Sequence, residues 1–300
     1  MKHLRRVLVA LLASACASIR PPPCSASGAW GVVHAPTPAS AERLSQHLAW
    51  LAPRIVASVP GLAVRPVDAR FVNGMHLDGM SPGLAVLVKG ATIERDHQRW
   101  IELPEGSDVV VERRTLAHEL VHYWLGPDWE TLPCFLEEGL ADNVKDSVIP
   151  AGCAHASREK ALILSSVLFG GLVLDADGVA LRCGTRLADL TPGESMKVAL
   201  FSSDRRALPT VRETLAVHRD ALKTVQNPED YAAMFCYGYL LVARIGVERL
   251  HALCVRARNA KRRIVPADWL LDAAGLRVDD KEAWNHAIIE LHRSGGRSAD

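Results

Sequence analysis

The sequence predicts an α+β fold in which a small N-terminal β-sheet is followed by a mostly helical C-terminal lobe. Apolar residues from 44 to 59 recur at the three- and four-residue spacing of one helix face. Between 62 and 103, short apolar runs are interrupted by glycine, proline and aspartate, which is typical of the strands of a small sheet. From residue 110 onward helical spacing dominates.

We expect one folded domain over residues 39–295. Its first part, 60–147, should hold the sheet and two helices, and its second part, 155–293, should be the helical lobe. A length of 300 residues, with 49% hydrophobic and 23% charged residues, is ordinary for a globular protein. The formal net charge of +1 gives no electrostatic reason to expect a nucleic-acid partner.

The N-terminus has the pattern of a signal peptide over residues 1–17. A basic start precedes an apolar run at 7–13, and the small residues 13–15 form an A-x-A cleavage site. We therefore expect an exported protein, either periplasmic or secreted. Cys16 directly follows that site, so a lipoprotein anchored through a lipidated Cys16 is the alternative, and the only membrane attachment that we expect. Residues 18–38 are rich in proline, serine and alanine, which indicates a linker.

The elements of the first half follow in order. A helix should run from Ser40 to Val59 and end at Pro60 and Gly61. The short apolar runs that we interpret as strands are 62–67, 70–72, 84–88 and 99–103.

The C-terminal half offers several amphipathic helices. One should begin at Asn227 and Pro228, where asparagine caps and proline occupies the first turn, and another should span Lys281–His292. The basic run 256–263 reads as a solvated helix face.

The seven cysteines form no C-x-x-C pair, which disfavours a zinc site made of cysteines. Cys153 and Cys183 lie in glycine-flanked stretches and are the first candidates for a disulfide in an oxidising compartment. Cys236 and Cys254 fall in helical patterns and fit a packed core.

The sequence His118-Glu119-Leu-Val-His122 carries the clearest chemical signal. Two histidines four residues apart lie on one face of a helix, one turn apart, so their imidazoles can bind one cation together. Nitrogen donors suit zinc, which activates a water molecule, and Glu119 can take the proton of that water as a general base. The alternative is a pair of core histidines that are hydrogen-bonded to backbone carbonyls.

A second helix follows closely. The first helix should end at Gly126 and Pro127, after which Thr131 can cap the next one. Two helices joined by a short loop pack antiparallel, which can bring a glutamate of the second helix onto the metal. Asp142 lies one turn after Glu138, on the same face, and a carboxylate there can accept the free N–H of a liganding histidine.

The two segments together resemble the gluzincin metallopeptidases, especially the peptidase-MA-like and M1-aminopeptidase-like group. The resemblance rests on His118-Glu119-x-x-His122 followed by Phe-Leu-Glu-Glu-Gly-Leu-Ala at 135–141. It implies a zincin-like fold, a Zn²⁺ cofactor, Glu138 rather than Glu137 as the third ligand, and Asp142 as the partner of a liganding histidine. Phe135 stands where tryptophan is usual, and the fifteen residues between His122 and Glu138 are slightly fewer than in the aminopeptidases.

The same resemblance implies a tyrosine that donates a hydrogen bond to the oxyanion. Tyr231 fits that position best and Tyr237 is the rival, while either ring can simply be packed. No segment resembles the G-x-M-E-N sequence that binds a free amino terminus, which speaks against an exopeptidase.

The expected activity is zinc-dependent hydrolysis of a peptide bond in a peptide or protein substrate, with Glu119 as general base. Two alternatives stay open: hydrolysis of a non-peptide amide at the same site, and a zinc-binding scaffold that turns over no substrate. The presence of Glu119 argues against the scaffold, because a structural zinc site needs ligands and no base.

Overall fold

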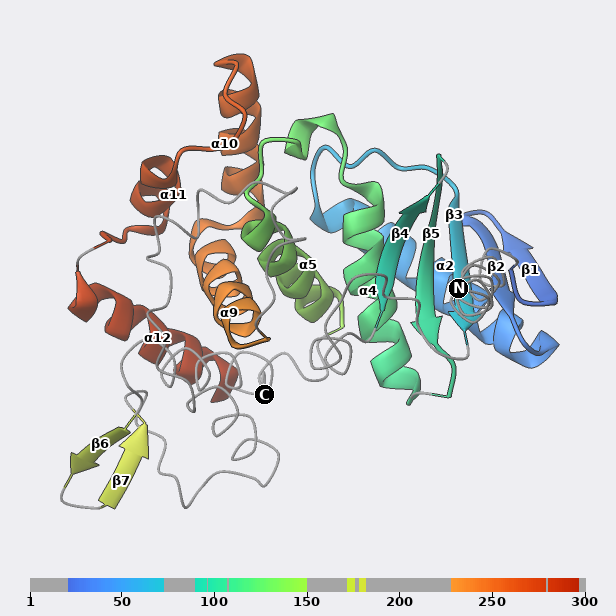
Figure 1. The fold of residues 1–300 in the computed structure, drawn as a ribbon, viewed down its shortest axis with the longest axis horizontal. Coiled ribbons are helices and arrows are strands. Elements are labelled where there is room, and N and C mark those ends of the chain that lie inside the picture. Colours follow the sequence, from blue (N-terminus) through green and yellow to red (C-terminus); the bar gives the residue numbers. More distant parts are fainter. Residues whose placement is uncertain are drawn as a thin grey trace, which may run out of the picture.

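The computed structural model describes residues 21–72, 90–95, 97–106, 108–149, 172–175, 178–181, 228–278 and 280–296. Within these ranges the fold is α+β, with a small mixed sheet and a mostly helical remainder, as the sequence predicts. The sheet lies at one end of the molecule, and helices α4 (Val109–Trp124), α5 (Cys134–Val148) and α9 (Pro228–Ile245) follow one another away from it (Figure 1).

The main sheet has five strands in the order β1-β2-β3-β5-β4. The strands are β1 (Cys24–Gly28), β2 (Gly31–Ala35), β3 (Val67–Val72), β4 (Ala91–Arg95) and β5 (Gln98–Pro104). The three central strands run parallel, while β1 and β4 are antiparallel edge strands. Helix α2 (Pro38–Ser58) packs against the first three strands and against α4, which in turn contacts β4 and β5.

Part of the expected linker at 18–38 is wrong, because β1 and β2 occupy residues 24–35. Small residues suggested a linker, but they also form this hairpin, in which Val33 and Ala35 are buried. Gly31 shows why a small residue is needed: its φ is +140°, and a Cβ there would lie 2.0 Å from the carbonyl oxygen of Val67 on β3. The strand character of this segment therefore depends on pairing with a distant strand.

The other strand predictions have mixed outcomes. The run at 99–103 is confirmed as β5 and the run at 70–72 lies within β3. The predicted strand at 62–67 is wrong, since only Leu62 forms a single bridge, to Leu125, before β3 begins at Val67. The run at 84–88 lies outside the described residues.

The helices agree more closely with the sequence. The prediction for 40–59 is confirmed as α2, where the side chain of Thr37 accepts a hydrogen bond from the Ser40 amide at 3.1 Å. Beyond α9, the lobe continues with α10 (Val247–Asn259), α11 (Ala267–Ala274) and α12 (Lys281–Gly296). A short antiparallel hairpin, β6 (Leu172–Asp175) and β7 (Gly178–Leu181), interrupts the expected helical half.

Two predicted helix starts have different outcomes. Helix α9 begins at Pro228 as predicted, while Asn227 lies outside the described residues. Thr131 does not cap α5, which begins only after Pro133, with no side-chain cap. The Thr131 hydroxyl instead donates to the carbonyl of Cys254 in α10, at 3.0 Å, because the short 3₁₀ helix η1 (Pro127–Trp129) turns the chain toward that helix.

The described residues contain free cysteines and no membrane-spanning helix. Of the cysteines with described side chains, Cys24, Cys134 and Cys254 are free thiols, and the last two are buried. The proposed partners Cys153 and Cys183, like Cys16 and the signal segment, lie outside the described residues. Within the described ranges, no helix combines the length and the apolarity needed to cross a bilayer.

Candidate metal centre

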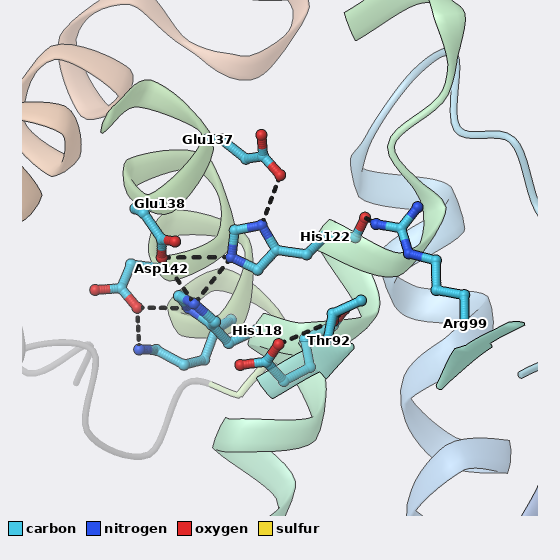
Figure 2. Close-up of polar contacts among 9 residues, drawn as sticks. Thr92, Arg99, His118, His122, Glu137, Glu138 and Asp142 are labelled. Atoms are coloured by element: carbon cyan, nitrogen blue, oxygen red, sulfur yellow. Dashed lines mark hydrogen bonds and ion pairs between the residues drawn. The ribbon is translucent and has the colours of Figure 1, made fainter. Parts of the chain in front are cut away.

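Helix α4 presents both histidines of the motif. The Asp108 side chain caps this helix by accepting from the Val110 amide at 2.8 Å, and the helix ends at Trp124. His118 and His122 lie one turn apart on the face toward α5, as the four-residue spacing predicts. On β5, the Arg99 guanidinium donates to the carbonyl of His122 at 2.8 Å, which satisfies a backbone acceptor in the last turn of α4 (Figure 2).

Helix α5 is held in place by close contact with α9. A Cβ on Gly139 would lie 2.2 Å from the Gly238 carbonyl carbon, and a Cβ on Gly238 would lie 2.0 Å from the Phe135 carbonyl oxygen. Only glycine permits the two backbones to approach so closely. The Asn143 amide bridges the helices by donating to the carbonyls of Gly139 and Tyr239 at 2.8 and 3.0 Å.

Three ligand-type atoms converge between α4 and α5. The Nε2 atoms of His118 and His122 lie 3.1 Å apart, and Glu138 Oε2 lies 3.1 Å from the first and 3.3 Å from the second. We call these three residues the metal-ligand cluster; they form a group that can hold a metal ion. Their side chains remain 15%, 11% and 14% exposed, so none of the three is fully buried.

Each imidazole has a carboxylate behind it (Figure 2). His118 Nδ1 donates to Asp142 Oδ1 at 2.9 Å, and His122 Nδ1 donates to Glu137 Oε1 at 2.8 Å. An ionised carboxylate can only accept, so each Nδ1 carries the proton and a neutral imidazole keeps its lone pair at Nε2. Lys145 donates to the same Asp142 oxygen and balances part of the negative charge.

The electrostatics of the cluster favour positive charge. Burial lowers the pKa of His118, but hydrogen bonds to Asp142 and Glu138 outweigh it and raise the pKa above its ordinary value. Burial also lowers the pKa of His122. The negative charge of Glu138 and the hydrogen bond to Glu137 outweigh burial and raise this pKa well above its ordinary value. Burial would raise the pKa of Glu138, yet the two histidines hold it well below its usual range.

The residues present fit a transition-metal ion. Two imidazole nitrogens and a carboxylate oxygen lie about 3 Å apart, and positive charge between them, from a proton on an imidazole or from a metal ion, stabilises this approach. In a tetrahedral zinc site with bonds of about 2.0–2.1 Å, neighbouring ligand atoms lie about 3.3 Å apart. The three distances of 3.1, 3.1 and 3.3 Å match that geometry. Two nitrogens and one oxygen suit zinc or a similar ion better than calcium, which prefers an all-oxygen set.

Glu119 lies on the side of α4 that faces the sheet. Its carboxylate is buried and accepts a hydrogen bond from the Thr92 hydroxyl of β4, at 2.9 Å from Oε2. Its carboxylate is not one of the three ligand-type groups that converge, which are those of His118, His122 and Glu138.

The tyrosines of α9 are placed only in part. Tyr231 is the fourth residue of this helix, within its first turn as predicted, but its side chain lies outside the described residues. The ring of Tyr237 packs edge-on against Trp284, with centroids 5.6 Å apart, and the Tyr239 hydroxyl donates to Asp146 at 3.0 Å. The latter two tyrosines are thus packed, which for Tyr237 is the alternative to an oxyanion role that the sequence left open.

The structure brings together His118, His122, Glu138 and Asp142 as the sequence predicts. Sequence reasoning missed Glu137 as the partner of His122; the available signal was a second glutamate beside the ligand, in a helix that had to be buried. It also missed Thr92, for which no signal existed because β4 was not predicted.

Comparisons of the chain with models of protein families, with curated proteins and with solved structures found no match. The chemistry of the site therefore rests on its own residues and distances.

Proposed function

We propose that this chain is a zinc-dependent hydrolase of the gluzincin type, with a zincin-like fold, that cleaves peptide bonds. One observation carries the proposal: the Nε2 atoms of His118 and His122 and the Oε2 atom of Glu138 converge at 3.1–3.3 Å, with carboxylates behind both imidazoles. The arrangement gathers two imidazoles and a carboxylate at one buried point, where positive charge, either from protons on the imidazoles or from a bound cation, offsets the charge of Glu138.

The side chains divide the work as follows. His118, His122 and Glu138 would hold the ion, while Asp142 and Glu137 keep the imidazoles in the tautomer that presents Nε2. The ion would supply Lewis acidity, which polarises the substrate carbonyl and makes a water molecule acidic near neutral pH. Glu119 would take the proton of the attacking water and return it to the leaving amine.

Two further assignments belong to the proposal. Tyr231 would donate a hydrogen bond to the oxyanion, as the resemblance to gluzincins implies. The protein would be exported through the N-terminal signal segment, either free or anchored through Cys16. Intact mass of material from its native host distinguishes these forms, because both lose the signal segment and only the anchored form carries the added mass of acyl chains on Cys16.

The test combines metal content with turnover. Purified protein should contain about one zinc per chain and cleave a mixed library of quenched fluorescent peptides. Glu119→Gln should keep the metal and lose turnover, because an amide holds its place without taking a proton. Glu130→Gln, at an exposed glutamate beyond α4, is the matched control and should behave as wild type.

Each other outcome has a definite meaning. If the protein cleaves only non-peptide amides, the substrate class in the proposal is wrong and the proposed mechanism stands. Full zinc occupancy with no turnover of either substrate type would leave a zinc-bearing scaffold. Absence of bound metal after loading would contradict the proposal as a whole.

A further inference from the structure

On the edge strand β4, the side chain of Thr92 contacts the carboxylate of Glu119, which we propose as the general base. Thr92 pairs with Ile101 of β5, and this register points its side chain at α4. Its hydroxyl oxygen lies 2.9 Å from Glu119 Oε2 and 3.2 Å from the Glu119 carbonyl oxygen. A hydroxyl has one proton to donate. Of the two acceptors, the carboxylate oxygen Oε2 lies closer and is the stronger one, so the Thr92 hydroxyl donates to it.

This contact depends on a close approach of strand and helix. A Cβ on Gly90, directly before β4, would lie 2.4 Å from Thr115 Cγ2 and 3.2 Å from Glu119 Cγ. The strand therefore begins against α4, and the short side chain of Thr92 reaches the Glu119 carboxylate directly. In the part of the chain that the structure describes, Thr92 is the only side chain that hydrogen-bonds this carboxylate.

We propose that Thr92 is a positioning residue for Glu119, and that it makes the two carboxylate oxygens unequal. The inference rests on the proposed function. Donation to Oε2 fixes the rotation of the carboxylate and leaves Oε1 as the oxygen that receives the proton. A freely rotating carboxylate would have to be oriented in every turnover, which adds to the activation barrier.

The proton transfer balances without any change at Thr92. One O–H bond of the attacking water breaks and a new O–H bond forms at Glu119 Oε1. The water oxygen uses the freed electron pair to bond to the carbonyl carbon, and the carbon–oxygen π bond breaks with its pair moving to the carbonyl oxygen. When that pair re-forms the π bond, the carbon–nitrogen bond breaks with its pair going to nitrogen, the proton passes from Oε1 to this nitrogen, and the carboxylate is regenerated. Thr92 keeps its own proton, because Oε2 accepts a hydrogen bond in both states of Glu119.

A pair of variants separates the hydroxyl from the shape of the side chain. Thr92→Val removes the hydroxyl and keeps a β-branched side chain of nearly the same volume, whereas Thr92→Ser keeps the hydroxyl. Thr92→Val should lower kcat by about tenfold or more, with KM and zinc content unchanged, and Thr92→Ser should retain most of the turnover. Ile93→Val, at the adjacent residue on the other face of β4, is the control and should match wild type.

A second readout does not depend on activity. A double-mutant cycle between Thr92→Val and Glu119→Ala, followed by urea unfolding of the metal-free protein, measures the coupling of the two side chains. Thr92→Val should lower the unfolding midpoint in the wild-type background and have little further effect beside Glu119→Ala. Additive effects would show that the hydrogen bond contributes nothing and would overturn the inference.

The two readouts distinguish failure of this inference from failure of the proposed function. If the wild-type protein cleaves peptides and Thr92→Val cleaves them equally fast, the role of Thr92 is wrong and the proposed function stands. A slow Thr92→Ser would likewise contradict it, because the hydroxyl is retained. If zinc-loaded wild type cleaves nothing, the proposed function fails and the role of Thr92 fails with it, even where the unfolding cycle shows coupling.

Discussion

Helix α4 carries two buried polar clusters that differ in what faces their histidines. Toward α5 lies the metal-ligand cluster. Toward α2 lies a second group, the arginine cluster, which consists of Arg43, His47, Glu112 and Arg113. In this group Arg43 Nε donates to Glu112 Oε2 at 3.0 Å, and Arg113 Nε donates to His47 Nδ1 at 3.0 Å. Both clusters combine side chains of α4 with side chains of a neighbouring helix, α5 in the first and α2 in the second, and both contain histidine and glutamate.

The sign of the surrounding charge separates them. Burial and the positive charge of Arg113 lower the pKa of His47, despite the neighbouring Glu112. In the metal-ligand cluster burial acts in the same direction, but the surrounding carboxylates raise the pKa of both histidines. A buried histidine is therefore a candidate ligand only where carboxylates hold its Nδ1 proton and its Nε2 faces other acceptors. His47 fails this criterion, since its Nδ1 accepts from a cation.

The largest expected effect is the loss of bound zinc when a residue of the metal-ligand cluster is removed. This test asks directly whether the two clusters differ in metal binding. His118→Ala or Glu138→Ala should lose most of the bound zinc, because two protein ligands rarely hold the ion. His47→Gln should keep the bound zinc, although His47 is also a buried histidine, on helix α2 that packs against α4. Elemental analysis of purified protein checks this, and full occupancy in Glu138→Ala would contradict the ligand assignment.

Glu137 sharpens the comparison because it hydrogen-bonds His122 Nδ1 and is not part of the metal-ligand cluster. Glu137→Leu removes the acceptor of the His122 Nδ1 proton, and zinc affinity should fall by about 10- to 100-fold. Glu137→Gln keeps an acceptor oxygen and should lose less. Competition with a chromogenic chelator gives both constants, with Asp142→Asn as the equivalent change behind His118. If the zinc affinity of Glu137→Leu is unchanged, then of the two hydrogen bonds from the imidazoles to carboxylates only the one from His118 to Asp142 contributes to metal binding.

The packing of α5 against α9 should matter for one cluster and not for the other. A Cβ at Gly139 would overlap the Gly238 backbone, so Gly139→Ala should destabilise the protein by about 1–3 kcal/mol and weaken zinc binding by moving Glu138. Gly28→Ala is the control, because the nearest atom to a Cβ there is Ser45 Oγ at an ordinary 3.7 Å. Urea unfolding measures both, and equal midpoints for the two variants would contradict the close helix contact.

The smallest effect is the pH dependence of stability that His47 contributes. Its folded pKa lies below the ordinary value of 6.5, so its contribution is fully present above about pH 6.5 and is lost as the pH falls through the folded pKa. Wild type should therefore lose stability relative to His47→Gln between about pH 7 and pH 5. Urea unfolding of zinc-loaded protein at several pH values checks the sign, and a difference that stays constant with pH would contradict it.

The sequence by itself determined the features that depend on local spacing. Residues four apart share a helix face whatever surrounds the helix, so His118 with His122 and Glu138 with Asp142 were predictable, as were α2 and the start of α9. The choice of Glu138 over Glu137 as the cluster residue came from the resemblance to gluzincins, and the structure places Glu138 Oε2 against both Nε2 atoms. The oxyanion role of Tyr231 stays a prediction.

Only the tertiary structure decided the features that depend on distant segments. Strands β1 and β2 exist because β2 pairs with β3 more than thirty residues later, and their own small residues carry no strand signal. Glu137 meets His122 because the Gly139–Gly238 contact fixes how α5 is rotated. Thr92 reaches Glu119 because β4 pairs with β5 in one register, and a slip of one residue would turn its side chain to the other face of the sheet. Long-range pairing and helix rotation are set by the whole fold, which is why local spacing could predict His118 with His122 and Glu138 with Asp142 but not the contacts of Glu137 and Thr92.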